Sequence, residues 1–142
     1  MDKITIVFWS QGGNTAAMAT AVAEGVKAAG REAEIVPVSE ASLDELKAAD
    51  AFAMGCPAMG AEALEEYEME PFVADVENFV SGKKIALFGS YGWGDGEWIR
   101  TWAEDAEAAG ARLVVEPVMA NGSPDGDAET ACAALGTALA NA

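Results

Sequence analysis

The chain has 142 residues, 51% of them apolar, and 24 acidic against 8 basic side chains give it a formal charge of −16. A chain of this length can bury about 70% of its unfolded surface, so we expect a single domain over residues 1–142. The charge excludes nucleic acid as a partner, because phosphate backbones repel such a surface, and it opposes self-association, which favours a monomer. No apolar run approaches the ~18 residues of a membrane span.

Cysteine usage and the N-terminus bear on compartment and metal binding. Cys56 and Cys132 are far apart, and the chain has no histidine. This excludes Cys/His zinc sites, four-cysteine iron–sulfur clusters and a CxxC redox pair, so we expect both thiols to be reduced and mostly buried. The run from Ile4 to Trp9 is too short and too β-branched for a signal peptide, and we therefore expect a cytoplasmic protein.

Much of the negative charge lies in one tract between Lys47 and Lys83, where no lysine or arginine occurs. Two compatible interpretations stay open. In the first, the tract is a solvated helix face or a general adaptation to salt. In the second, it steers basic partners and disfavours added negative charge nearby. Its acidic residues are Glu62, Glu65, Glu66, Glu68, Glu70, Asp75 and Glu77.

Strand and helix patterns alternate along the whole chain. β-branched apolar runs predict strands at 4–9, 33–38, 51–56, 84–91 and 113–119, with Pro117 indicating an irregularity in the last one. Amphipathic spacing predicts helices at 14–29, 42–47, 69–80 and 98–106 and a last helix around 132–139. Near-continuous apolar strands joined by helices imply a parallel sheet covered on both faces, and right-handed crossovers make this a doubly wound α/β fold.

Ligands of such folds bind beyond the carboxyl ends of the strands, so the loops there are informative. The loop after the first strand reads Ser10, Gln11, Gly12, Gly13, Asn14, Thr15. Its glycines permit a tight turn that exposes backbone N–H groups beside a helix N-terminus, and its polar side chains add donors. It lacks the lysine of a P-loop and does not match GxGxxG. The loop is therefore either a phosphate cradle without a cation or an ordinary glycine turn with an Asn or Thr cap.

The loops after the third and fourth strands add a second feature. In the loop after the third strand, Pro57 stiffens the exit from the strand and Gly60 permits unusual backbone angles. Taken alone, this loop fits a plain turn before an acidic helix. The other places Trp93 between glycines, free to cover an aromatic ligand or to stand exposed, whereas Trp98 has the helical spacing of a core residue. A phosphate cradle and an aromatic platform at one end of a sheet together indicate a flat, phosphorylated cofactor.

Three segments carry a family resemblance. SQGGNT, GCPAMGAE and LFGSYGWGDGEW follow the first, third and fourth strands. They resemble the short-chain flavodoxins of anaerobic bacteria, and the similarity covers essentially the whole chain. It implies a flavodoxin-like five-stranded parallel sheet in the order 2-1-3-4-5, with helices on both faces.

The resemblance also implies FMN as cofactor. The loop 10–15 would hold its phosphate, and the isoalloxazine would lie between Met59 and Trp93, with Glu62 at the flavin N3 edge and Asn121 bracing the site. One departure is Gly12, where the family usually carries a threonine whose hydroxyl contacts the phosphate. The cofactor-binding residues implied are Ser10, Gln11, Gly12, Gly13, Asn14, Thr15, Pro57, Ala58, Met59, Gly60, Ala61, Glu62, Ser90, Tyr91, Gly92, Trp93, Gly94 and Asn121.

In function, the resemblance implies an electron-transfer protein and not an enzyme: a low-potential one-electron carrier that cycles FMN between semiquinone and hydroquinone in place of ferredoxin. The peptide between Gly60 and Ala61 is expected to turn over on reduction, so that the Gly60 carbonyl accepts a hydrogen bond from the flavin N5–H. A site without cations, close to the acidic tract, disfavours an anionic reduced flavin. The partners implied are ferredoxin-type redox enzymes with basic docking surfaces.

Three alternatives are weaker. An FMN-dependent NAD(P)H:quinone-type reductase on the same fold needs a substrate pocket, and the short connections leave little room for one. A phosphoacceptor receiver needs carboxylates at the ends of the first and third strands, where this chain has Trp9 and Cys56. A flavin-free descendant acting as an interaction module is kept open by Gly12 alone.

Overall fold

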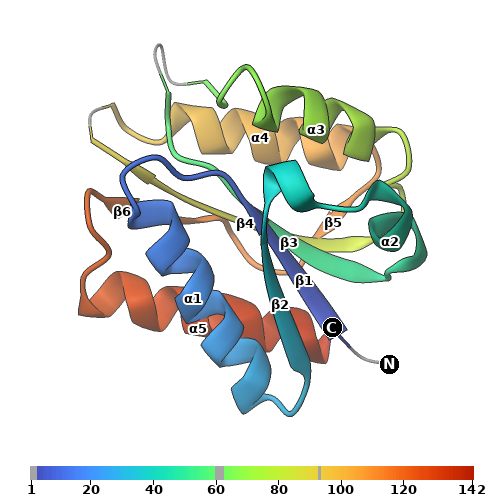
Figure 1. Ribbon diagram of the computed structural model, residues 1–142, viewed down its shortest axis with the longest axis horizontal. Helices are drawn as coiled ribbons and strands as arrows, with labels where there is room; N and C mark the ends of the chain where they lie inside the picture. The colour runs from blue at the N-terminus through green and yellow to red at the C-terminus, as the bar shows by residue number, and fades with distance from the viewer. Residues whose placement is uncertain (1–2, 60–62, 93) are drawn as a thin grey trace.

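The computed structural model describes residues 3–59, 63–92 and 94–142, and their strands form one parallel sheet in the order β2-β1-β3-β4-β5 (Figure 1). A further strand, β6, also pairs with β4. The expected doubly wound fold is confirmed. The strands are β1 (Lys3–Phe8), β2 (Glu32–Pro37), β3 (Ala51–Gly55), β4 (Lys84–Tyr91), β5 (Arg112–Leu113) and β6 (Val118–Asn121). The helices are α1 (Asn14–Ala28), α2 (Leu43–Ala48), α3 (Met69–Glu77), α4 (Glu97–Ala108) and α5 (Gly126–Asn141), with a 3-10 turn at Val38–Glu40.

Two apolar layers sandwich the sheet. Helices α1 and α5 cover one face with Met18, Val22 and Leu135 (Figure 1). Helices α3 and α4, with Leu46 of α2, cover the other. Strand β3 is buried along its whole length, as its near-continuous apolar sequence predicts for a central parallel strand. No helix of the described chain is long and apolar enough to cross a membrane.

The prediction of a single fifth strand over 113–119 is wrong. Two short strands flank the same edge of β4: Arg112 and Leu113 pair with Lys84 and Ile85, and Val118–Asn121 pair with Phe88–Tyr91. Residues 114–117 lie opposite only Ala86 and Leu87, so the register is interrupted by extra residues. Pro117, which has no N–H to donate to the ladder, lies in this interruption.

Capping residues mark two helix ends where the sequence predicts them. Ser42 caps α2, its hydroxyl accepting a hydrogen bond from the Glu45 N–H at 3.2 Å, as its sequence predicts. Gly30 follows α1 with φ of 90°, as expected of a residue that ends a helix. Helix α3, in contrast, ends at Glu77, earlier than the apolar spacing indicates.

Both cysteines are buried free thiols, as expected. Burial raises the pKa of Cys56 and of Cys132 to about 12 in each case. Both are therefore neutral near pH 7, and neither is a reactive thiolate.

Helices α1 and α5 approach each other closely because each has a glycine, Gly25 and Gly136, facing the backbone of the other helix. A Cβ at Gly136 would overlap the Val22 carbonyl oxygen, and one at Gly25 would overlap the Ala133 carbonyl oxygen. Thr137 completes the contact, its hydroxyl donating to the Gly25 carbonyl at 3.0 Å. This contact fixes α1, whose N-terminus follows the first loop.

We expect Gly136→Ala to lower the free energy of unfolding by about 2–3 kcal/mol, because overpacking outweighs the better helix propensity of alanine. Gly126→Ala is the matched control in the same helix, since nothing lies within 4 Å of a Cβ at Gly126, and it should raise stability by about 0.5 kcal/mol. Urea denaturation measures both variants, and equal effects would contradict the close-contact account.

Candidate functional site

The loops singled out from the sequence meet at one end of the sheet. They follow the carboxyl ends of β1, β3 and β4, and Asn121 ends the neighbouring strand β6 (Figure 1). A hydrogen bond from the Ala58 N–H to the Ser90 carbonyl, at 3.0 Å, holds the second loop against β4. The sheet therefore gathers these segments as a doubly wound fold predicts.

The first loop presents backbone donors that the rest of the described chain leaves unpaired. Gly13, with φ of 93°, precedes α1 and offers it no side-chain cap. The N–H groups of Gln11, Gly12, Asn14 and Thr15 make no hydrogen bond to another described residue. Grouped at a helix N-terminus, such donors form an anion site.

Side chains around these donors shape the loop. The Ser10 hydroxyl accepts hydrogen bonds from the N–H groups of Gly13 and Ala16, at 3.2 and 3.3 Å, which leaves its proton to donate outward. The buried hydroxyls of Thr15 and Ser90 lie 3.1 Å apart and tie the loop to β4. Asn14 accepts a hydrogen bond from Ser123 at 3.2 Å, so its amide nitrogen is left to donate.

A cavity of about 180 Å³ lies between the first two loops and β4. Its lining, taken from the described residues, contains no lysine or arginine, and a Cβ at Gly12 would meet nothing within 4 Å. The lining residues are Trp9, Ser10, Gln11, Gly12, Asn14, Thr15, Pro57, Met59 and Ser90. Here an anion can be held by backbone dipoles and hydroxyls without a cationic side chain.

The two described ends of the second loop, Met59 and Ala63, lie side by side. Met59 and Ala63 exchange two backbone hydrogen bonds of 2.9 Å each, which brings together the two ends of the turn. Gly60, Ala61 and Glu62 lie outside the described residues, so their expected roles stay predictions. The half-buried Met59 lines the cavity beside the first loop, where an inner contact to a ligand ring is expected.

The segment after this turn depends on Glu65, which is only 5% exposed. Its carboxylate accepts hydrogen bonds from the N–H groups of Tyr67, Glu68 and Met69, at 2.8, 2.7 and 2.9 Å. Burial opposes its ionisation, but these three donors outweigh burial and lower its pKa. The interpretation of the acidic tract as a solvated or steering face is therefore wrong for Glu65, which caps the start of α3.

The third loop contains backbone turns that require glycine. Gly94 and Gly96 have φ of 85° and 96°. Tyr91 packs at 5.7 Å between ring centroids against Trp98, and Trp98 is buried in the core with its indole N–H donating to the Cys56 carbonyl at 3.0 Å. The expectation that Trp98 is a core residue is confirmed, whereas Trp93 lies outside the described residues.

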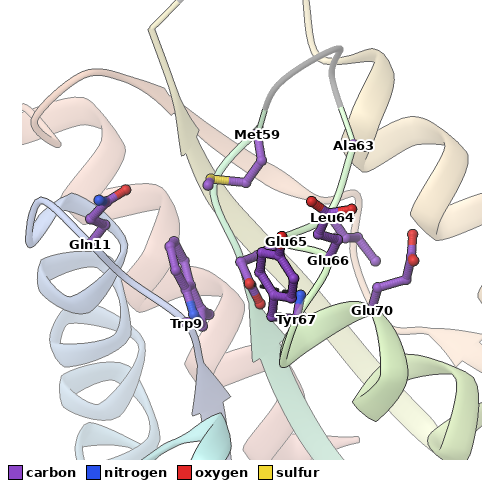
Figure 2. A pocket seen from close by; sticks show the side chains of 9 residues that line it. All are labelled: Trp9, Gln11, Met59, Ala63, Leu64, Glu65, Glu66, Tyr67 and Glu70. Atoms are coloured by element: carbon purple, nitrogen blue, oxygen red, sulfur yellow. Dashed lines mark hydrogen bonds between the residues drawn. The ribbon is translucent and has the colours of Figure 1, made fainter.

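A second cavity, of about 480 Å³, lies between the first loop and the segment 63–70 (Figure 2). Sequence reasoning missed two of its aromatic residues. Trp9 bridges the two segments, its indole N–H donating to Glu68 at 3.1 Å, and Tyr67 is 83% exposed. Trp9 could have been noticed from its place at the end of the first strand, but no local pattern marks Tyr67.

Comparison with known proteins gives a family. The flavodoxin family model matches residues 6–136. The flavodoxin of Clostridium beijerinckii is 44% identical over 96% of this chain and 98% of its own length, and that of Megasphaera elsdenii is 44% identical over 98% and 99%. The solution structure of two-electron reduced Megasphaera elsdenii flavodoxin superposes with a TM-score of 0.90 at 43% identity, covering 98% of this chain and 99% of that one. This chain belongs to the flavodoxin family.

Flavodoxins are electron-transfer proteins that bind FMN, so the recognition made from the three segments is confirmed, and the reductase alternative gains no support. The site also fits the cofactor. FMN ends in a phosphate, and the first loop offers that phosphate four unpaired N–H groups and the Ser10 hydroxyl beside an open cavity.

The capping role of Glu65 is testable by Glu65→Gln, which keeps the size of the side chain and removes its charge. We expect the free energy of unfolding to fall by about 1–2 kcal/mol at neutral pH, because hydrogen bonds to a charged acceptor are stronger. Since folding lowers the pKa of Glu65, this contribution is present above the ordinary Glu pKa and is lost as the pH falls through the folded-state value. Urea denaturation at several pH values measures it.

The exposed neighbour Glu66 provides the control, because no hydrogen bond to another described residue restrains it. Glu66→Gln should leave stability nearly unchanged at every pH. Equal losses in the two variants would show that Glu65 acts through the net charge of the tract and not as a cap.

Proposed function

We propose that this flavodoxin is a low-potential one-electron carrier that replaces ferredoxin between redox enzymes. Bound FMN supplies the redox chemistry by taking up and releasing electrons one at a time. The observation that carries the proposal is the group of four unpaired N–H donors at the start of α1, which opens on a cavity shared by the first and second loops and β4. The protein's own task is to bind, orient and shield the cofactor.

The family resemblance suggests a role toward FMN for the residues of each loop. The loop 10–15 would hold the phosphate, Met59 would contact the inner side of the ring and Trp93 its outer side. Glu62 would hydrogen-bond the N3 edge, the backbone near Gly92 and Gly94 would meet N1 and O2, and Asn121 would brace the site from β6. Pro57, Ala58, Ser90 and Tyr91 would support these contacts, and the peptide between Gly60 and Ala61 would offer its carbonyl to the flavin N5–H. Support comes from the gathering of the described loops at one edge of the sheet.

Charge sets the direction of the potential. No lysine or arginine lines the described cavities beside the first and second loops. Glu66, Glu68 and Glu70 are exposed on the neighbouring segment. Negative charge added to this site therefore gains no ion pair and is repelled by the segment, which lowers the potential of the second electron.

We also propose that the chain acts as a cytoplasmic monomer forming one domain over residues 1–142. Its partners are ferredoxin-type enzymes that present basic docking surfaces. The formal charge of −16 supports the monomeric state, because it opposes self-association, and the basic partners, because it steers basic proteins toward the molecule.

Stepwise anaerobic reduction of the FMN-loaded protein, followed by visible absorption, tests the carrier function. We expect two separated one-electron steps, with a long-wavelength band that appears midway and then bleaches. Direct bleaching of bound flavin in one two-electron step would contradict the carrier function and favour a reductase.

The missing hydroxyl at Gly12 is testable by Gly12→Thr. A Cβ there meets nothing within 4 Å and the backbone of Gly12 does not require glycine, so threonine fits and its hydroxyl can donate to the phosphate. A hydrogen bond to a charged acceptor gains about 1.5 kcal/mol or more, which predicts FMN binding at least ~10-fold tighter by calorimetric titration. Gly12→Val, with the same shape but no hydroxyl, should not show the gain, and equal affinities of the two variants would refute the hydroxyl contact.

A further inference from the structure

Met119 differs in exposure from the other methionines of the described chain. Met18, Met54 and Met69 are buried in the core, each at most 1% exposed, and the half-buried Met59 lines the proposed cofactor cavity. Met119 is 40% exposed, and it is the one methionine among the exposed large apolar side chains of the described residues. Small molecules in solution therefore reach Met119 more readily than the other four.

The side chain of Met119 also forms a contact between β6 and the third loop. Val118 and Ala120 pack toward the layer of α1 and α5, so Met119 points to the opposite face of the sheet. There its sulfur lies against Gly96, since a Cβ at Gly96 would overlap the sulfur. Gly96, with φ of 96°, immediately precedes α4 and ends the third loop. Met119 thus supports the end of a loop that is expected to contact the flavin.

Arg100 holds the residue just before this glycine. Its Nη1 donates to the Asp95 main-chain carbonyl at 2.9 Å, and its Nη2 donates to the Asp95 carboxylate at 3.2 Å. A Cβ at Gly96 would also lie 3.3 Å from Nη1, so the guanidinium and the Met119 sulfur meet at one glycine. Gly94 and Gly96 flank Asp95 with φ of 85° and 96°, and glycine permits backbone rotation more freely than other residues. Arg100 therefore helps to fix the direction of the Asp95 carbonyl.

Oxidation of the Met119 sulfur would change the chemistry of this contact. A thioether is a weak acceptor, whereas a sulfoxide is polar and carries an oxygen that accepts hydrogen bonds. At Met119 the oxygen would be added beside Gly96, next to Arg100 Nη1. Because hydrogen bonds from a guanidinium are charge-assisted and strong, the sulfoxide would compete with the Asp95 carbonyl for this donor.

We propose that Met119 is an oxidation site through which hydrogen peroxide weakens the binding of FMN. The O–O bond of the peroxide breaks, one oxygen atom bonds to the sulfur and the other leaves as water, so the thioether loses the two electrons that the peroxide gains. The sulfoxide oxygen accepts from Arg100, the Asp95 carbonyl is released, and the adjoining Gly94 backbone leaves the position expected to meet the flavin. Sulfoxide reductases can reverse the change. The inference rests on the proposed role of the third loop and adds a modification that controls it.

Peptide mapping by mass spectrometry tests the site on the FMN-loaded protein treated with dilute hydrogen peroxide. We expect Met119 to gain one oxygen atom at least ~10-fold faster than Met18, Met54 and Met69, which are shielded in the core. A rate at Met119 as slow as at these buried methionines would overturn the proposal.

Calorimetric titration with FMN, after removal of the flavin from the treated protein, tests the consequence. Oxidation should weaken FMN binding about fivefold, the effect expected of one lost hydrogen bond, and methionine sulfoxide reductases should restore the affinity. Met119→Leu, which keeps the volume of the side chain without the sulfur, should keep its FMN affinity through the same treatment. Equal weakening in this variant would show that another residue is responsible and would overturn the proposal, as would affinity that the reductases do not restore.

Arg100→Leu tests whether the guanidinium transmits the effect, because leucine cannot donate to a sulfoxide. Each variant is compared with its own untreated sample, so a lower starting affinity does not affect the result. Oxidation of Met119 in Arg100→Leu should leave FMN binding nearly unchanged. A loss as large as in the unaltered protein would contradict the transfer of Arg100 from Asp95 to the sulfoxide.

Stepwise reduction of the untreated protein distinguishes this proposal from the carrier function. Two one-electron steps, together with FMN binding that does not respond to oxidation of Met119, would remove the methionine proposal alone. Weaker FMN binding after oxidation, in a protein that reduces in one two-electron step, would keep the oxidation site while removing the carrier function.

Discussion

Four backbone N–H groups at the start of α1, left without partners by the rest of the described chain, are the constraint on which the site depends. Such donors need an acceptor, and the loop has no cation to offer, so an anion must be held by dipoles and hydroxyls. Their position is fixed from behind. The glycine-mediated contact of α1 with α5 sets the axis of the helix, and the paired hydroxyls of Thr15 and Ser90 tie its first turn to β4.

The acidity of the chain divides into parts with different physical roles. Glu65 is buried, and its carboxylate accepts hydrogen bonds from backbone N–H groups. These bonds order the segment that follows the second flavin loop. The exposed acids of the same tract repel negative charge added to the flavin site, where no cation neutralises it. This lowers the reduction potential, as suits a strong electron donor. One excess of charge thus serves folding through Glu65 and lowers the potential through the exposed acids.

Much of the fold and site follows from the sequence because periodicity and loop chemistry are local properties. The apolar runs predict the bounds of β3 and β4 to within one residue, and the Ser42 cap lies where its pattern predicts. The split of the last strand could not be read in full, since the pairing register with β4 depends on residues 114–117 and on a distant strand. Burial of Glu65 was equally hidden, because it depends on neighbours brought in by packing.

The most direct test of the central claim compares FMN with riboflavin, which lacks the phosphate, in calorimetric titrations of the flavin-free protein. If backbone donors at the start of α1 hold the phosphate, FMN should bind at least ~100-fold more tightly, since several charge-assisted hydrogen bonds are lost with riboflavin. Inorganic phosphate should compete with FMN and leave riboflavin binding unopposed. Equal affinities for the two flavins would contradict the account, because the cradle would then contribute nothing to holding the cofactor.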